Sequence, residues 1–173
     1  MTANRILETK TPMIKTQTNE LTPALRERHQ VGANWQFGRR FNVRWSEVDS
    51  FSHANHAAYF GWIEETRNLY LADAGYPLKD TSVPGPILRE VGCVYERSLS
   101  LQADVLVTAR TAWMGRTSFR MDYAVWSEGL IANAFAICIW MLSSDASKRP
   151  IPQDLRTYMQ TLDGAIERVH PPP

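Results

Sequence analysis

The sequence predicts an α+β domain in which a single curved antiparallel sheet wraps around one long helix. Three features predict this fold class: a helical apolar period over residues 57–75, strand-like segments after it, and short polar or glycine-containing joints between the last three segments. A helix and a sheet that each have one apolar face bury both faces by packing against each other. We therefore expect the sheet to curve around the helix.

A strand is predicted before the helix. Over Arg40–Trp45, the apolar residues Phe41, Val43 and Trp45 alternate with polar ones, which is the period of a strand with one buried face. This strand should end at the polar loop 46–56.

The long helix has clear boundaries in the sequence. Asn55 is placed to cap its start, and Gly75 followed by Pro77 should end it. The residues on the broad face of helical period are Tyr59, Trp62, Ile63, Thr66, Leu69, Tyr70 and Ala74.

The remaining strands are expected at residues 87–99, 104–114, 117–127 and 130–143, the last three as an antiparallel meander. In the last strand, large apolar residues alternate with Ala132, Ala134, Ala136 and Cys138. The small side chains allow another element to approach closely, and the long helix is the obvious occupant. A terminal helix is predicted over residues 153–168.

Composition divides the chain into three parts. Residues 1–36 are predicted to be a flexible N-terminal arm, in which only Pro23–His29 has the character of a short helix. Residues 37–168 form the predicted domain. Residues 169–173 end in three prolines and should be a loose tail.

Charge and hydropathy disfavour several classes of protein. The 173 residues carry 19 Lys+Arg and 18 Asp+Glu, a net charge of +1, whereas nucleic-acid binders usually have a basic excess. The longest apolar run, 131–142, is far shorter than the ~20 residues of a membrane span. Because the first ten residues lack the apolar core of a secretory signal, we expect a cytoplasmic protein. Cys93 and Cys138 have no Cys or His at ligand spacing, so buried free thiols and no metal site are expected.

Chemistry is concentrated in the loop between the first strand and the helix. Backbone N–H groups at the start of a helix, here around His56, lack intrahelical acceptors and can polarise a carbonyl oxygen. Asp49 lies a few residues upstream and can act as a nucleophile or as a general base toward water. A solvated connection, in which Asn55 only caps the helix, is the alternative interpretation.

Other catalytic signatures are absent from the sequence. It contains no G-x-S-x-G elbow, no H-E-x-x-H helix and no glycine-rich phosphate loop. Acyl transfer by a carboxylate is a chemistry that needs none of these signatures and is therefore still compatible with the sequence.

The loop and the helix carry a family resemblance. Residues 43–60, VRWSEVDSFSHANHAAYF, and 62–67, WIEETR, resemble the N-terminal motif of hotdog-fold acyl-CoA thioesterases of the 4-hydroxybenzoyl-CoA thioesterase type. A weaker similarity continues at 115–119, GRTSF, and at 149–152, RPIP. The resemblance covers most of residues 40–155 and implies the hotdog fold.

The resemblance also implies roles for individual residues. Asp49 matches the catalytic carboxylate, and His56 matches the position whose backbone N–H polarises the thioester carbonyl. The family commonly has glycine where this chain has Ser52, and a second Asn where it has His56. Supporting roles are implied for Glu47, His53, Asn55 and Tyr59.

Charged residues outside the loop have two interpretations each. Glu64 and Glu65 are candidates because a related hotdog branch places its catalytic Glu on the central helix, although a salt-bridged flank with Arg67 as neighbour explains them too. Basic residues of the family bind coenzyme A phosphates near the corresponding turns, but exposed hairpin charges are the alternative. The basic candidates here are Arg116, Lys148 and Arg149.

The expected function is acyl-CoA thioester hydrolysis to a free acid and coenzyme A, without a metal or a dissociable cofactor. Two alternatives share the same residues: an acyl-carrier-protein thioesterase and a non-hydrolytic acyl-binding module. A hotdog hydratase is disfavoured because its His-containing motif is not evident. The resemblance implies a homodimer or homotetramer whose sheets join edge to edge. From charge and hydropathy we expect neither nucleic acid nor a membrane as a partner.

Overall fold

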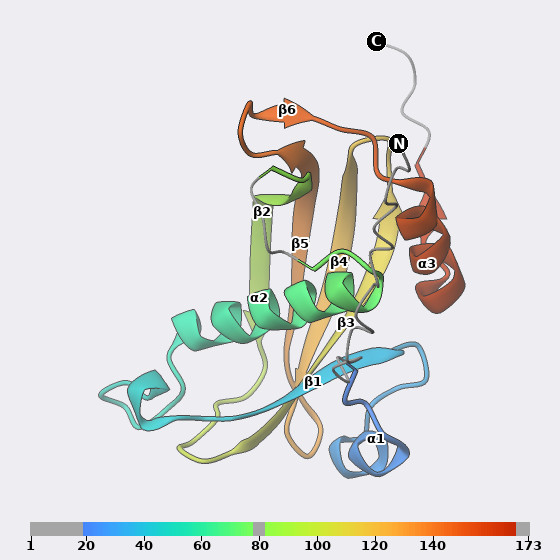
Figure 1. Cartoon of the computed structure of the whole chain (residues 1–173). Helices are drawn as coiled ribbons and strands as arrows, with labels where there is room; N and C mark the ends of the chain where they lie inside the picture. The colour runs from blue at the N-terminus through green and yellow to red at the C-terminus, as the bar shows by residue number, and fades with distance from the viewer. Residues whose placement is uncertain (1–18, 78–81, 169–173) are drawn as a thin grey trace, which may run out of the picture.

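The computed structural model describes residues 19–77 and 82–168. Five strands form a sheet in the order β1-β3-β4-β5-β2, while β6 pairs with β5 and β7 pairs with β3 (Figure 1). No helix among these residues has the length and hydropathy needed to cross a membrane. The elements in chain order are α1 (Pro23–His29), β1 (Phe37–Asn42), the 3-10 helix η1 (Trp45–Glu47), α2 (His56–Asp73), β2 (Gly85–Tyr95), β3 (Asp104–Met114), β4 (Ser118–Trp126), β5 (Leu130–Leu142), β6 (Ser147–Lys148), α3 (Gln153–Asp163) and β7 (Ile166–Glu167).

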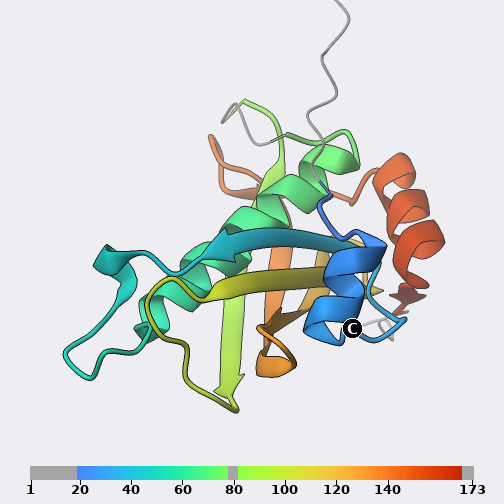
Figure 2. The same cartoon turned by 90° about the horizontal axis from the view of Figure 1, so that it is seen from below.

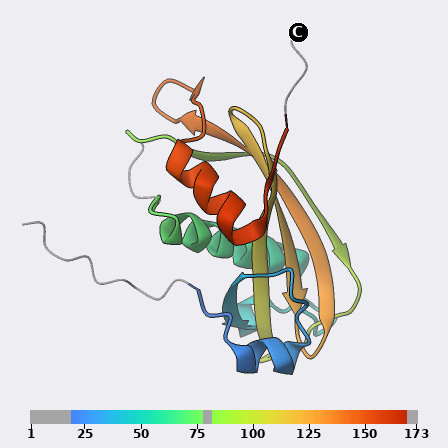
Figure 3. The same ribbon diagram turned by 90° about the vertical axis from the view of Figure 1, so that its right-hand side faces the viewer.

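The sheet curves around α2, as the sequence predicts. Seen from the side, α2 and α3 lie on the concave side of the sheet (Figure 3). The strand pairs of the five-stranded path are all antiparallel. The predicted α+β class, a curved antiparallel sheet around one long helix, is therefore confirmed.

Helix α2 is fixed at both ends by the predicted residues. The Asn55 side chain accepts a hydrogen bond from the Ala58 N–H at 2.9 Å, and Gly75 has φ +91° in the turn that follows the helix. The buried face consists of Ala58, Tyr59, Trp62, Ile63, Thr66, Arg67, Tyr70 and Leu71.

The small side chains of β5 face the helix. Ala132, Ala134, Ala136 and Cys138 are at most 7% exposed and belong to the same core cluster as the apolar face of α2. Since small side chains leave room for a helix, their alternation with large residues specifies which face of β5 is concave.

The prediction for the first strand is wrong at its end. β1 ends at Asn42, and the Trp45 side chain is 82% exposed instead of buried. The Glu47 carboxylate accepts a hydrogen bond from the Arg44 N–H at 2.8 Å, which turns the chain into η1. A local side-chain contact thus overrides the alternating pattern.

The predicted flexible arm is also wrong for residues 19–36. Val31 and Trp35 are buried in a second cluster with Leu106 and Ala124, on the opposite face of β3 and β4 from the main core (Figure 2). The short helix expected at Pro23–His29 is confirmed as α1. Residues 1–18 and the predicted tail at 169–173 lie outside the described part of the chain.

His29 anchors α1 to the sheet. Its side chain is fully buried, and its Nδ1 accepts a hydrogen bond from the Glu128 N–H at 3.3 Å. Its Nε2 lies 3.6 Å from Oδ2 of Asp104, which also pairs with Arg28 and Arg40. Burial lowers the pKa of His29 below 6.5, although the Asp104 charge opposes this.

The C-terminal segment is shorter as a helix than predicted. α3 ends at Asp163, Gly164 has φ +67°, and β7 then pairs with β3. Asp163 Oδ2 accepts hydrogen bonds from the Tyr70 hydroxyl at 2.5 Å and from the Thr111 N–H at 2.7 Å. One carboxylate oxygen thereby joins α3 to both α2 and β3.

The buried His29 makes stability depend on pH. Because its folded pKa is lowered, the unfolded chain binds the proton more tightly, and the free energy of unfolding should fall as the pH drops below 6.5. Urea titrations between pH 5 and 8 test this. The His29→Gln variant, which cannot titrate, should show a weaker pH dependence in this range, and an equal dependence would contradict the prediction.

Asp163 should contribute to stability through the two donors it satisfies. Asp163→Ala leaves the buried Tyr70 hydroxyl and Thr111 N–H without this acceptor, which should lower the free energy of unfolding by about 2–4 kcal/mol. Asp163→Asn keeps an acceptor and should cost less. Urea denaturation measures both, and an Ala variant as stable as the wild type would refute this account.

Candidate functional site

Glu47 holds the loop between β1 and α2 against the helix. Its Oε2 accepts from the Arg44 N–H at 2.8 Å, and its Oε1 accepts from Nε1 of Trp62 at 3.1 Å. Its backbone carbonyl accepts from the Asn55 N–H at 2.7 Å. These bonds fix both ends of the loop relative to the start of α2. Glu47 therefore positions the loop through hydrogen bonds.

Asp49 lies in a tight turn closed by a β-bridge between Val48 and Ala54. Its N–H donates to the His53 carbonyl at 2.9 Å. Its Oδ1 accepts from the Phe51 N–H at 2.8 Å and from the His53 N–H at 3.3 Å. Oδ2 has no hydrogen-bond partner among the described residues, and the side chain is exposed. One oxygen therefore orients the carboxylate while the other is available for chemistry.

Ser52 has the backbone conformation that favours glycine. Its φ is +62°, in the left-handed region. Ser52 stands where proteins with the resembling motif commonly have glycine. The turn therefore keeps a glycine-like conformation without a glycine.

The start of α2 provides unpaired backbone donors. Asn55 caps the Ala58 N–H, whereas the N–H groups of His56 and Ala57 have no acceptor within the described part of the chain. The helix dipole adds partial positive charge at this end. The first turn of α2 can therefore stabilise an oxyanion, and His56 needs only its backbone to do so.

The remaining predicted residues near the loop differ in their environments. The His53 side chain is exposed. Tyr59 is 2% exposed and packs against Trp62 and Tyr95, with ring centroids 5.1 and 5.0 Å apart. Burial raises the pKa of Tyr59 to about 12, so its hydroxyl keeps its proton near neutral pH. Its ring belongs to the main core, against which Val48 and Ala54 of the loop pack.

Glu64 and Glu65 occupy a salt-bridged flank of α2. Glu64 Oε1 lies 3.4 Å from the Arg67 guanidinium, and Glu65 Oε1 lies 3.5 Å from that of Arg39. The Glu64 side chain is 65% exposed. Within one chain these ion pairs match the interpretation of Glu64 and Glu65 as a salt-bridged flank of the helix.

The three basic candidates lie together, but at the opposite end of the sheet from Asp49. The Arg116 carbonyl accepts from the Ile151 N–H at 2.9 Å, which ties its turn to the segment after β6. Lys148 is exposed on β6, and Arg149 pairs with Asp145 at 3.0 Å. Figure 1 shows β6 at one end of the sheet and the loop before α2 at the other. Within a single chain, the three basic candidates therefore lie apart from the loop that contains Asp49.

Sequence reasoning missed two exposed aromatic residues beside Asp49. Phe51 is 80% exposed and Trp45 is 82% exposed. The signal was present for Phe51, because a large aromatic residue within the polar loop 46–56 has no local apolar face to join, whereas Trp45 continues the alternating pattern of the preceding strand. Phe51 and Trp45 therefore add exposed apolar surface to the segment that contains Asp49.

Both cysteines are free thiols, as expected, but only Cys138 is buried as predicted. Cys138 is buried, and burial raises its pKa to about 11, while Cys93 is partly buried with its pKa also raised. In residues 19–77 and 82–168, no three His, Cys, Asp or Glu side chains are grouped to hold a metal ion.

Residues 43–158 match the thioesterase-like superfamily. No curated protein matches the chain. Among solved structures, a thioesterase-superfamily protein from Jannaschia sp. CCS1 is 30% identical, with a TM-score of 0.75 over 84% of this chain and 94% of that one. A Thermus thermophilus thioesterase complexed with coenzyme A and Zn is 23% identical, with a TM-score of 0.67 over 77% and 98% of the two chains.

A more distant structure shares the fold. The 1,4-dihydroxy-2-naphthoyl-CoA thioesterase from Synechocystis is 16% identical, with a TM-score of 0.66 over 73% of this chain and 97% of that one. The hotdog architecture is therefore shared at low identity, and the family match spans well over half of the chain. This chain belongs to the thioesterase-like superfamily and is a thioester hydrolase.

Proposed function

We propose that the protein is an acyl-CoA thioesterase in which Asp49 and the backbone N–H of His56 act on the thioester. The observation that supports this most is that one loop holds a carboxylate with a free oxygen and leads directly to unpaired backbone N–H groups. Oδ1 of Asp49 is held by two backbone N–H groups, Oδ2 is free, and the loop ends at the unpaired amides of α2. A carboxylate and an oxyanion site are the two parts that thioester hydrolysis needs.

Two routes are compatible with this arrangement. In the first, Asp49 takes a proton from water as the water oxygen attacks the carbonyl carbon. In the second, Asp49 itself attacks that carbon, and water then hydrolyses the resulting anhydride. In both routes the C–S bond breaks, the thiolate leaves and takes up a proton, and the His56 amide stabilises the negative charge on the carbonyl oxygen.

Coenzyme A is the proposed carrier, and the 4-hydroxybenzoyl-CoA type is the finer proposal from the sequence. The basic turn containing Arg116, together with Lys148 and Arg149, offers guanidinium and ammonium groups for phosphates. The Thermus relative is complexed with coenzyme A, and the Synechocystis relative is named for an aromatic acyl-CoA. An acyl carrier protein remains the alternative carrier.

The proposed active unit contains two chains. β2 is a terminal strand of the sheet and carries five exposed large apolar residues, namely Ile87, Leu88, Val91, Val94 and Tyr95. An uncovered apolar edge strand favours pairing with another strand. A twofold axis at this edge pairs the strands antiparallel, which places the Asp49 end of one chain beside the Arg116 end of its partner.

Net charge bears on how this unit finds a substrate. With a total of +1, the protein as a whole offers little attraction for the phosphates of coenzyme A, so capture depends on local groups such as Arg116 and Lys148. Exposed Lys and Arg at one end of the sheet act over about a Debye length, near 10 Å at 0.1 M salt. They can guide a phosphate to that end but cannot reach the Asp49 loop at the other, which is why the proposed unit joins two chains.

Removing the charge of Asp49 should abolish most of the activity. Asp49→Asn keeps the shape, and its side-chain oxygen can still accept from the loop, but it loses the general base or nucleophile. We expect kcat to fall at least ~100-fold. Release of free thiol from a panel of aliphatic and aromatic acyl-CoAs, and from acyl carrier protein thioesters, measures this and identifies the carrier.

Glu27→Gln is the matched control for this experiment, since Glu27 is an exposed carboxylate on α1 and has no part in the proposed site. It should retain the wild-type rate. Equal turnover by the wild type and Asp49→Asn would rule out the proposed role of Asp49. No turnover of any thioester by the wild type would favour the acyl-binding module.

A charge on the β2 edge should separate the chains. Val94 is 62% exposed, and Val94→Lys should convert a dimer to a monomer in sedimentation velocity and lower kcat/KM in parallel. Ile166→Lys, at a position 68% exposed on β7, should remain dimeric. A wild-type chain that is active as a monomer would exclude the two-chain unit.

A further inference from the structure

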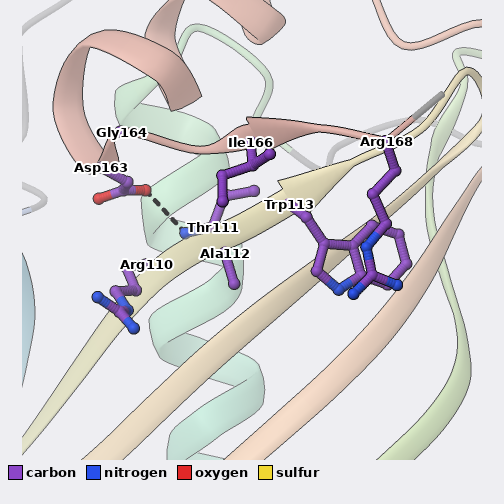
Figure 4. Close-up of a pocket in the computed structure, with 8 residues that line it drawn as sticks. All are labelled: Arg110, Thr111, Ala112, Trp113, Asp163, Gly164, Ile166 and Arg168. Atoms are coloured by element: carbon purple, nitrogen blue, oxygen red, sulfur yellow. Dashed lines mark hydrogen bonds between the residues drawn. The ribbon is translucent and has the colours of Figure 1, made fainter.

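A pocket of about 350 Å³ lies at the edge of β3, beside the end of α3. Figure 1 shows α3 on the far side of the molecule from the loop that precedes α2. Along this edge, β1 pairs with β3 as far as Ala109, and β7 begins to pair at Trp113. Residues 110–112 therefore have no neighbouring strand here. The end of α3 and the start of β7 border the gap (Figure 4).

One end of the pocket contains an unmatched donor and acceptor. Asp163 Oδ2 is held by Tyr70 and Thr111, but its Oδ1 is buried without a hydrogen-bond partner. Nε of Arg110 is likewise buried without a partner, and its guanidinium lies 3.7 Å from the Asp122 carboxylate. Buried polar groups normally have hydrogen-bond partners. The Asp163 oxygen and the Arg110 nitrogen are therefore candidates to bond a polar group of a ligand.

The other end contains a cation above an aromatic ring. The Arg168 guanidinium lies 4.2 Å from the centroid of the Trp113 ring (Figure 4). The Arg168 N–H donates to the Met114 carbonyl at 2.8 Å, which fixes this residue to β3. No carboxylate of residues 19–77 or 82–168 pairs with Arg168. Its charge is available to an anion.

Small residues separate the two ends. Figure 4 shows Ala112 between the Arg110 and Arg168 ends. Gly164 borders the pocket, and a Cβ built there would meet no atom within 4 Å. A bulge lies between Thr111 and Trp113, so Arg110 and Met114 pair with Asp122 and Phe119 of β4, which are three residues apart, or roughly 10 Å at the rise of a strand. The pocket therefore suits an elongated ligand.

We propose that this pocket binds an elongated carboxylate that carries a hydroxyl group at its far end. A hydroxyl group donates one hydrogen bond and accepts others, which matches Oδ1 of Asp163 and Nε of Arg110. A carboxylate matches the planar guanidinium of Arg168. The Arg110 guanidinium already lies 3.7 Å from the Asp122 carboxylate, so the positive charge available to an anion is that of Arg168.

Binding requires a small movement of Arg110. Both unpartnered atoms are enclosed in this structure, and the Arg110 side chain is 31% exposed. The path to Asp163 Oδ1 requires the guanidinium to move from its place over the Trp35 ring, whose centroid lies 5.3 Å away. This site is independent of the catalytic role proposed for Asp49, because the two share no residue.

Three probes of matched shape test the proposal by isothermal titration calorimetry of the full chain. They are 3-(4-hydroxyphenyl)propionate, 3-phenylpropionate, which lacks the hydroxyl, and 4-ethylphenol, which lacks the carboxylate. The first should bind at least ~10-fold more tightly than either of the others, since each missing group removes a hydrogen bond to a charged partner. Equal affinities for all three probes would overturn the proposal.

Variants assign the binding to this pocket. Arg168→Gln should weaken both acids at least ~10-fold and leave 4-ethylphenol unchanged. Asp163→Asn presents an NH2 group in place of Oδ1, so the hydroxyl loses the acceptor of its own proton and its advantage in affinity should shrink. Arg89→Gln, a matched loss of charge on β2, and Asp49→Asn should change neither preference. Unchanged binding in Arg168→Gln, or a loss of binding in Asp49→Asn instead, would place the probe elsewhere and refute the site.

Discussion

The burial of one face of α2 against the concave face of the sheet is the constraint on which the other elements depend. The small side chains of β5 allow the helix to lie close, and Tyr59, Trp62 and Ile63 fill the space between them and the first strands. At roughly 1.5–3 kcal/mol for each large side chain removed from water, this interface supplies a large part of the stabilisation of the domain. It also fixes where the helix begins, and hence where its unpaired amides point.

Glu47 fixes the loop between β1 and α2 relative to the helix. Its carboxylate connects the Arg44 N–H to the Trp62 indole, so the turn containing Asp49 cannot swing away from α2 without breaking both bonds. The same residue explains why Trp45 leaves the strand and becomes exposed. The loop and the helix start are thus held relative to each other, although neither Asp49 nor His56 is buried in a single chain.

The sequence was sufficient for the regular elements and for the location of the candidate site. The period of α2, the Asn55 cap and the alternation in β5 all rest on local patterns that the core does not override. Residues 19–36 were misjudged because their few apolar side chains show no period and are buried only by contacts with β3 and β4. The Asp163 contacts with α2 and β3 could not be predicted from local patterns either, since they join residues 93 and 52 positions apart.

The loop also explains how the chain can depart from the resembling motif at Ser52 and His56. The turn is closed by the Val48–Ala54 bridge and by backbone bonds between Asp49 and His53, which together can hold Ser52 at a φ that costs a non-glycine residue about 1 kcal/mol. His56 contributes an N–H that every residue except proline possesses. Because these two positions act through the backbone, their side chains are free to vary, whereas the carboxylate of Asp49 has no backbone substitute.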